Sequence, residues 1–91
     1  MVLVKKNIKL LSLCIITKNE ESKLPVCLST VKNIVDEIIL VDTGSTDNTL
    51  QIANEAGAKI YKKKWKNNFS EIRNYALEKA NGKWILFLDA D

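Results

Sequence analysis

The stretch from Ile38 to Asp47, Ile-Ile-Leu-Val-Asp-Thr-Gly-Ser-Thr-Asp, decides the fold. Its apolar run ends abruptly at the carboxylate of Asp42, which is typical of a buried strand that reaches its loop. Gly44 then offers a permissive backbone, and the hydroxyl of Ser45 can cap a following helix. Because ligands of open α/β sheets bind beyond the carboxyl ends of the strands, Asp42 lies where we expect chemistry.

The end of the chain repeats this design. Trp84 to Leu88 is continuously apolar and runs straight into Asp89-Ala90-Asp91. Because parallel strands end at the same edge of a sheet, the two strands would deliver three carboxylates to one edge.

Two further strands and the helices between them fit the remaining sequence. Leu10–Ile16 is a nearly continuous apolar run, as a strand buried on both faces requires, and Lys59–Tyr61 is a short third strand. Ser22 can cap a first helix that carries Pro25 in its first turn. Gly57 stops a second helix in the C′ position.

Apolar residues at helical spacing mark the buried face of each helix. Asn68 and Glu71 predict a capping box at the start of the third helix, which Gly82 ends. The predicted stripes are Leu24, Leu28, Val31 and Val35 for the first helix, Leu50, Ala53 and Ala56 for the second, and Phe69, Ile72, Ala76, Leu77 and Ala80 for the third.

Strands and helices alternate along the whole chain at short spacing. We therefore predict an α/β fold, a parallel sheet of strand order 3-2-1-4 with helices on both faces. The chain reverses direction between the first and fourth strands, and the crevice at such a switch point is the expected ligand site. Thr17–Glu20, Asp42–Ser45 and Asp89–Asp91 all open into it.

The composition is that of an ordinary soluble globular protein, with 46% hydrophobic and 27% charged residues among 91. This excludes the disordered and collagen-like classes, and a chain this short forms one domain at most. No His is present, which removes the commonest general base and transition-metal ligand. Cys14 and Cys27 lie in apolar contexts without zinc-site spacing, which indicates buried thiols in a reducing compartment.

The net charge is +3, and basic residues gather in Lys62-Lys63-Lys64-Trp65-Lys66. A run that short usually forms a solvated face, which we weigh against contact with a membrane surface or a polyanion. The apolar run before Lys18 is too short to span a bilayer, and no signal-peptide cleavage site follows it. We predict a cytoplasmic protein with no nucleic-acid partner, and peripheral membrane contact as the alternative location.

Asp89 and Asp91 are two residues apart, so both side chains project from one face if the strand continues through them. Paired carboxylates suit Mg²⁺ or Mn²⁺, whose remaining ligands are water and phosphate oxygens. The alternative is that both are merely polar residues at a strand end. Asp42 either accepts hydrogen bonds from N–H groups of its own turn or binds a nucleobase or ribose. Arg73 is either a solvated charge on the third helix or a hydrogen-bond donor that reaches the crevice.

Four motifs together resemble the nucleotide-binding half of the inverting family 2 glycosyltransferases. They occur in the family's order, and the likeness runs from Leu11 to the end of the chain. The motifs are Ile16-Thr-Lys-Asn-Glu-Glu21, Val41-Asp-Thr-Gly-Ser-Thr-Asp47, Ile72-Arg-Asn-Tyr-Ala76 and Asn81-Gly-Lys-Trp-Ile-Leu-Phe-Leu-Asp-Ala-Asp91.

The resemblance implies the N-terminal, Rossmann-like portion of a GT-A fold and sugar transfer from a nucleotide diphosphate sugar, commonly a uridine diphosphate sugar. It implies that Asp89 contacts the ribose and, with Asp91, the metal that bridges the diphosphate. A divalent cation would stabilise the charge on the departing diphosphate. The residues expected to bind the donor are Thr17, Asn19, Glu20, Asp42, Thr43, Gly44, Ser45, Arg73 and Asp89.

The sequence departs from the family pattern in two places. Many relatives carry a second Asp where this chain has Thr43, which bears on the preference for uracil. Relatives also continue well past the position of Asp91, into an acceptor-binding half that carries the general base. We therefore expect residues 1–91 to be a single truncated donor-binding domain with little transferase activity, whose free fourth strand invites pairing with a second copy.

Two other function classes compete with this interpretation. A Rossmann-like nucleotide-binding module without catalysis would bind nucleotide whether or not Mn²⁺ is present. An oligomerising or membrane-surface piece would use Trp65 and the lysines around it, and would bind anionic vesicles in a salt-sensitive manner. Neither alternative explains why three polar loops converge on one edge.

Overall fold

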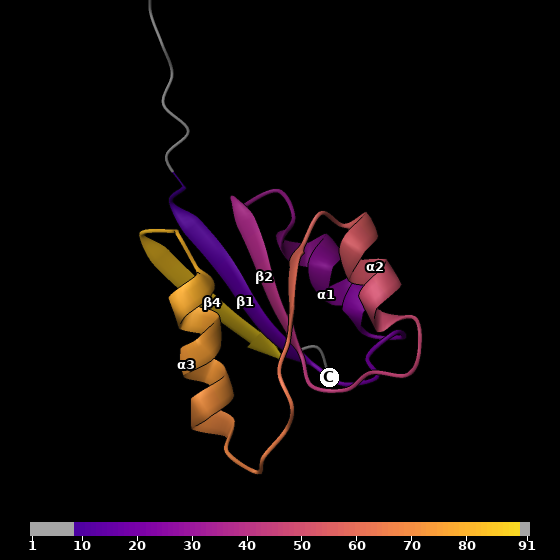
Figure 1. The fold of residues 1–91 in the computed structure, drawn as a ribbon. Helices are drawn as coiled ribbons and strands as arrows, with labels where there is room; N and C mark the ends of the chain where they lie inside the picture. The colour runs from indigo at the N-terminus through magenta and orange to yellow at the C-terminus, as the bar shows by residue number, and fades with distance from the viewer. Residues whose placement is uncertain (1–8, 90–91) are drawn as a thin grey trace, which may run out of the picture.

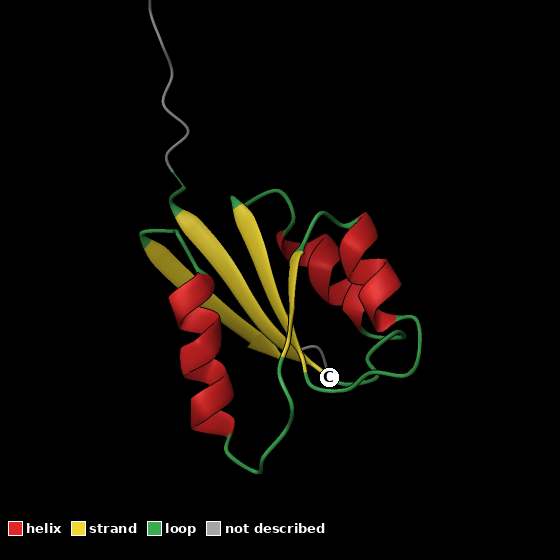
Figure 2. Cartoon of the chain, viewed as in Figure 1, coloured by secondary structure: helices red, strands yellow, loops and turns green. Residues whose placement is uncertain are grey.

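The structure is a computed structural model that describes residues 9–89, and it contains one parallel sheet with helices on both faces (Figures 1 and 2). The strand order is β3-β2-β1-β4 and every neighbouring pair is parallel, as predicted. The elements are β1 (Leu11–Thr17), α1 (Leu24–Val31), β2 (Glu37–Asp42), α2 (Thr49–Glu55), β3 (Lys59–Lys62), α3 (Phe69–Lys79) and β4 (Trp84–Asp89).

Helices α1 and α2 cover one face of the sheet, and α3 covers the other (Figure 2). Each face has its own core, and the two central strands supply both. Leu13, Ile15 and Leu40 point towards α1 and α2, whereas Cys14 and Ile39 point towards α3. This alternation explains why β1 and β2 read as continuous apolar runs, since a strand between two helical layers has no solvent face.

The central strands are much better buried than the edge strands. Every residue of β2 is buried, whereas β3 is half-exposed. In β4, Ile85 remains 37% exposed and Trp84 72% exposed. The predicted fourth strand is therefore present, but as an edge strand whose outer side has no neighbouring strand among the described residues.

The start and end of α1 differ from the prediction. Ser22 does not cap the helix, because Lys23 is the N-cap residue and makes no side-chain cap hydrogen bond. The Glu20 carbonyl instead accepts the N–H groups of Lys23 (3.2 Å) and Leu24 (2.8 Å), which takes over the role of the cap. The helix ends at Val31, so Val35 packs against the core from the following turn rather than from the helix.

Fewer residues of α2 and α3 are buried than the predicted apolar stripes contain. Ala56 is exposed, and in α3 Phe69 is 48% and Leu77 37% exposed. Ile72 and Ala76, one turn apart, carry the buried contact of α3. The other side of a short helix on a small sheet meets solvent.

The predicted start of α3 and the predicted end of α2 are confirmed, whereas α3 ends at Lys79 with Ala80 as its C-cap residue, before Gly82. The Asn68 side chain caps α3 by accepting the N–H of Glu71 at 3.1 Å. Gly57 has φ +80°, which permits the left-handed turn that ends α2.

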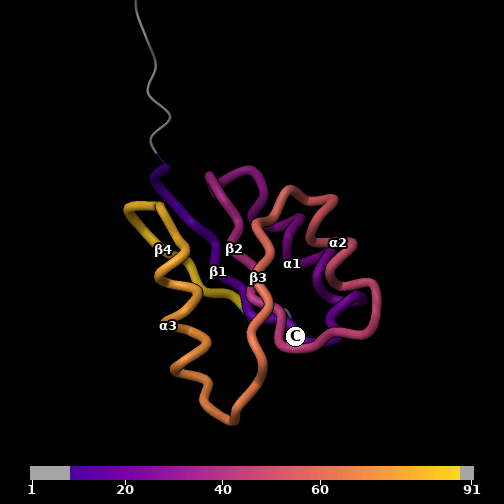
Figure 3. The backbone as a smooth tube through the Cα atoms, in the orientation of Figure 1, coloured from indigo at the N-terminus to yellow at the C-terminus, as the bar shows by residue number. Residues whose placement is uncertain are grey.

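No helix in the described part of the chain is long and apolar enough to cross a membrane. The backbone trace shows that the loop after β1 runs beside the loop after β2 (Figure 3), and hydrogen bonds between them confirm the contact. The predicted switch-point edge therefore exists as one continuous rim.

Candidate functional site

The strands bring the predicted site residues to the same edge of the sheet. Thr17 pairs with Asp42 at the ends of β1 and β2, and Ile16 pairs with Asp89 of β4. Since neighbouring strands lie about 4.8 Å apart, Asp42 and Asp89 are separated by about 10 Å across β1. The side chain of Asp89 and all of Asp91 lie outside what the structure describes.

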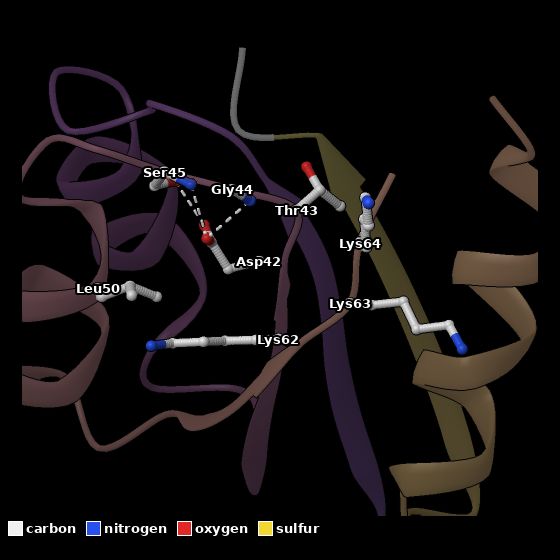
Figure 4. Close-up of a pocket in the computed structure, with 8 residues that line it drawn as sticks. All are labelled: Asp42, Thr43, Gly44, Ser45, Leu50, Lys62, Lys63 and Lys64. Carbon is white, nitrogen blue, oxygen red and sulfur yellow. Dashed lines mark hydrogen bonds between the residues drawn. The ribbon is translucent and has the colours of Figure 1, made fainter. Parts of the chain in front are cut away.

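Asp42 is the most heavily hydrogen-bonded side chain of the rim (Figure 4). Its Oδ1 accepts the hydroxyls of Thr17 (2.9 Å) and Ser45, and its Oδ2 accepts the N–H groups of Gly44 (3.1 Å) and Ser45 (2.8 Å). Gly44 has φ +126°, a conformation that glycine adopts without strain. The carboxylate therefore organises the turn in which it lies.

Hydrogen bonding decides the charge state of Asp42. The side chain is only 3% exposed, and burial by itself would raise its pKa. The bonds from Ser45, Thr17 and Gly44 outweigh burial and lower the pKa below its ordinary value. Of the two roles that the sequence left open for Asp42, the structure contains the contact with its own turn.

Asn19 joins the loop after β1 to the loop after β2. Its backbone is left-handed, with φ +54°, and its N–H donates to the Ser45 hydroxyl at 2.8 Å. Its side-chain Oδ1 accepts the N–H groups of Thr46 (2.7 Å) and Asp47 (3.3 Å). The predicted site residue Asn19 is thus a structural tie between the two loops.

Glu20 and Thr43 strengthen the same junction. The N–H of Glu20 donates to the hydroxyl of Thr49 at 2.9 Å, and the Thr43 hydroxyl donates to the Thr17 carbonyl at 3.1 Å. Thr49 is fully buried and was not predicted as part of the site. A hydroxyl at the start of a helix was the one sequence signal that could have identified it.

A pocket of about 340 Å³ opens beside Asp42, between the ends of β2 and β3 (Figure 4). Its wall consists of Asp42, Thr43, Gly44, Ser45, Leu50, Lys62, Lys63 and Lys64. The lysines belong to the basic run that the sequence pattern favours as a solvated face. Their placement in this wall follows from β3 pairing with β2, which the run itself does not reveal.

Arg73 lies at a second, smaller pocket of about 210 Å³ on the other side of β1. Its guanidinium carbon is 4.8 Å from the ring centre of Phe87, a cation–π contact. Ile16, Phe69 and Leu88 complete the wall. Within residues 9–89 Arg73 makes no ion pair, so its N–H donors remain available to a ligand.

A divalent cation at this rim has a limited choice of ligands. No group of three or more His, Cys, Asp or Glu side chains in the described residues could hold a metal ion. Asp42 already accepts four hydrogen bonds, and the lysines of its pocket repel cations. Paired carboxylates at Asp89 and Asp91 fit a hard cation that takes its other ligands from water and phosphate.

The comparison with protein families gives a match over nearly the whole chain. The family described as "Glycosyl transferase family 2" matches residues 12–91. All four motifs quoted above lie within this range.

Three curated relatives illustrate the likeness. A TPR repeat-containing protein of Synechococcus elongatus is 54% identical over 80 residues, which is 88% of this chain and 20% of that protein. An uncharacterised glycosyltransferase of Rickettsia typhi is 42% identical over 91% of this chain and 28% of its own length. The SPbeta prophage-derived glycosyltransferase SunS of Bacillus subtilis is 43% identical, over 85% and 19%. The chain thus spans less than a third of each of these relatives.

Solved structures share the fold. Glucosyl-3-phosphoglycerate synthase of Mycobacterium tuberculosis, in complex with uridine diphosphate, superposes with a TM-score of 0.77 at 24% identity. The likeness covers 91% of this chain and 34% of the synthase. The same synthase has also been solved with Mn²⁺, uridine diphosphate glucose and phosphoglyceric acid.

Proposed function

The chain belongs to glycosyl transferase family 2, and from this premise we propose that it binds a nucleotide-sugar donor for metal-dependent sugar transfer. The observation that carries the proposal is the shared rim, on which Thr17, Asp42 and Asp89 end three adjacent parallel strands. This rim is the switch-point edge where α/β sheets bind their ligands.

The proposed donor-binding residues fall into two groups. Thr17, Asn19, Glu20 and Asp42 to Ser45 form one interlocked pair of loops, which supports a rigid seat for the nucleoside. Asp42 itself acts mainly by holding this seat, because its oxygens are already occupied. Arg73 supplies free guanidinium donors from the α3 side, stacked on Phe87.

We assign the metal to Asp89 and Asp91, with Mg²⁺ or Mn²⁺ as the cation. When bound, the cation offsets charge on the diphosphate. The pairing of β4 with β1 up to Asp89 supports this assignment, because it brings the backbone of Asp89 to the same edge of the sheet as Asp42.

A uridine diphosphate sugar is the donor we favour. Support comes from the synthase of Mycobacterium tuberculosis, which was solved with uridine diphosphate and with uridine diphosphate glucose. Thr43 stands where many relatives carry a second acid, and its hydroxyl is already engaged with the Thr17 carbonyl. The acceptor and the sugar stay outside the proposal.

We further propose that the 91 residues alone transfer little sugar. A general base must reach the acceptor hydroxyl, and we assign the acids of this rim to the donor, the metal and the turn. We propose a cytoplasmic location, which the buried thiol of Cys14 supports.

The test is titration of uridine diphosphate with and without Mn²⁺, on the wild-type chain and on Asp91→Ala. We expect Mn²⁺ to increase affinity at least about tenfold in the wild type and to have no effect on Asp91→Ala. Glu78→Ala, on the exposed side of α3, is the control and should keep the wild-type response. Equal weak binding in all samples would remove the donor-site assignment, and tight binding that ignores Mn²⁺ would favour a nucleotide-binding module without catalysis.

A further inference from the structure

The pocket beside Asp42 has a charge that the donor-binding roles do not explain. One aspartate and three lysines line it (Figure 4). We call it the β2–β3 pocket and define it by Asp42–Ser45, Leu50 and Lys62–Lys64.

Two of the three lysines have no carboxylate partner within the described residues. Lys63 points towards α3, where its Nζ lies 3.5 Å from Glu71 and 4.9 Å from the ring centre of Tyr75. Lys62 points towards Leu50, and Lys64 lies beside Thr43 (Figure 4). The wall therefore carries one carboxylate and two lysines without a carboxylate partner among the described residues, which makes the pocket electropositive.

The pocket is also rich in free donors and poor in free acceptors. Asp42 already accepts four hydrogen bonds from the loops. Two further backbone N–H groups of its wall are engaged as well, since Thr43 donates to the Thr17 carbonyl and Lys63 to the Asp42 carbonyl, both at 2.9 Å. The ammonium groups of Lys62 and Lys64 are the donors left for a ligand.

From this arrangement we propose that Lys62 and Lys64 make the β2–β3 pocket an anion-binding site for a phosphate-class group. A compact, strongly charged lysine ammonium binds phosphate as a point charge, without the planar geometry that Arg requires. The site repels divalent cations, so it binds its anion without metal. It lies about 10 Å or more from the β4 end of the rim, because β1 separates β2 from β4.

The experiment uses pyrophosphate as the probe, at low salt with a chelator present. Lys62→Ala and Lys64→Ala should each weaken binding about threefold, and the double variant about tenfold, as expected for solvent-exposed ion pairs. Lys66→Ala is the matched control, because Lys66 lies in the same exposed loop and is not part of the wall. An equal loss in Lys66→Ala, or no pyrophosphate binding by the wild type, overturns the proposal.

Uridine diphosphate distinguishes the two sources of the anion. If the phosphate belongs to the nucleotide, the double variant also weakens uridine diphosphate, and pyrophosphate competes with it. If it is a separate phosphate, affinity for uridine diphosphate with Mn²⁺ is unchanged and pyrophosphate binds alongside it. Both results support an anion-binding site in the β2–β3 pocket. Metal-free pyrophosphate binding without any Mn²⁺-dependent uridine diphosphate binding would overturn the proposed donor function alone.

Discussion

Asp42 and Glu37 are buried carboxylates at opposite ends of β2. Asp42 is engaged by Thr17 and by the turn that follows it, at the edge of the sheet where the strands end. Its hydrogen bonds extend across the rim to the loop after β1, because Ser45 also accepts from the N–H of Asn19. One residue thus holds together the loops that follow β1 and β2.

Asp42→Asn should lower the free energy of unfolding by about 1–3 kcal/mol. The amide nitrogen of Asn cannot accept the hydrogen bonds that one carboxylate oxygen accepts now, so buried donors lose their partner. Urea unfolding measures the change. Glu78→Gln, which removes a charge from an exposed position of α3, is the control and should leave stability unchanged.

Binding of uridine diphosphate to Asp42→Asn gives the second measurement. If the loops lose their shape, affinity falls together with stability. A variant of wild-type stability and wild-type affinity would show that the carboxylate does not organise the rim.

The amino ends of the strands are held together by Glu37, which connects several elements. Its oxygens accept from Ser12 of β1, from Lys59 of β3 at 3.2 Å and from the backbone of Asn81 between α3 and β4. Gly82 follows in the same turn, and a Cβ there would lie 2.7 Å from the Ser12 backbone nitrogen. The turn into β4 therefore approaches β1 too closely for a larger residue.

Glu37 should make stability depend on pH in acid. Burial favours a higher pKa, but the bonds from Ser12, Asn81 and Lys59 lower the pKa from 4.5 to about 2. A lowered pKa means that the folded chain binds the proton less readily than the unfolded chain. The stabilisation is therefore complete above pH 4.5 and is lost as pH falls towards 2.

Glu37→Gln isolates this contribution. The substitution should lower the free energy of unfolding by about 2 kcal/mol at pH 7. The reason is that an NH₂ group, which only donates, replaces one of the two buried oxygens that accept hydrogen bonds. The loss should shrink as pH falls below 4.5, because protonation of Glu37 then favours the unfolded wild-type chain, and it should level off near pH 2, where the folded carboxylate is protonated as well. Urea unfolding at a series of pH values tests this, and a constant difference between the two proteins at all pH values would contradict it.

At the scale of the whole molecule, the two central strands of the sheet are paired on both sides, and the two edge strands are paired on one side only among the described residues. β1 and β2 have strands on both sides, whereas β4 has a neighbour only on its inner side among the described residues. Its exposed Trp84 and Ile85 add apolar surface to unpaired backbone groups. Such an edge is a template for pairing with a second copy of the chain.

We therefore predict that the 91-residue chain self-associates through β4. Ile85→Lys should shift sedimentation towards monomer, because a charge on an edge strand opposes pairing. Leu77→Lys is a matched control, since Leu77 is also 37% exposed but lies on α3. Monomeric wild-type protein across the concentration range, or the same shift in both variants, would rule out the β4 edge.

The sequence by itself determined the α/β class, the strand order β3-β2-β1-β4 and the shared rim of Thr17, Asp42 and Asp89. These features follow from local patterns, because apolar runs of strand length and right-handed crossovers leave few topologies. The cap of α3 at Asn68 was also predictable, since donor and acceptor lie three residues apart.

Only the tertiary structure decided which residues of the rim contact one another. The bond between Thr17 and Asp42 joins residues 25 positions apart, and it belongs to the set of hydrogen bonds that holds the turn after β2. Lys62 and Lys64 line a pocket with Asp42 because the register of β3 on β2 pairs Lys62 with Asp42, and the predicted strand order does not fix that register. Such contacts depend on which loops meet in space, and neither periodicity nor spacing along the chain contains that information.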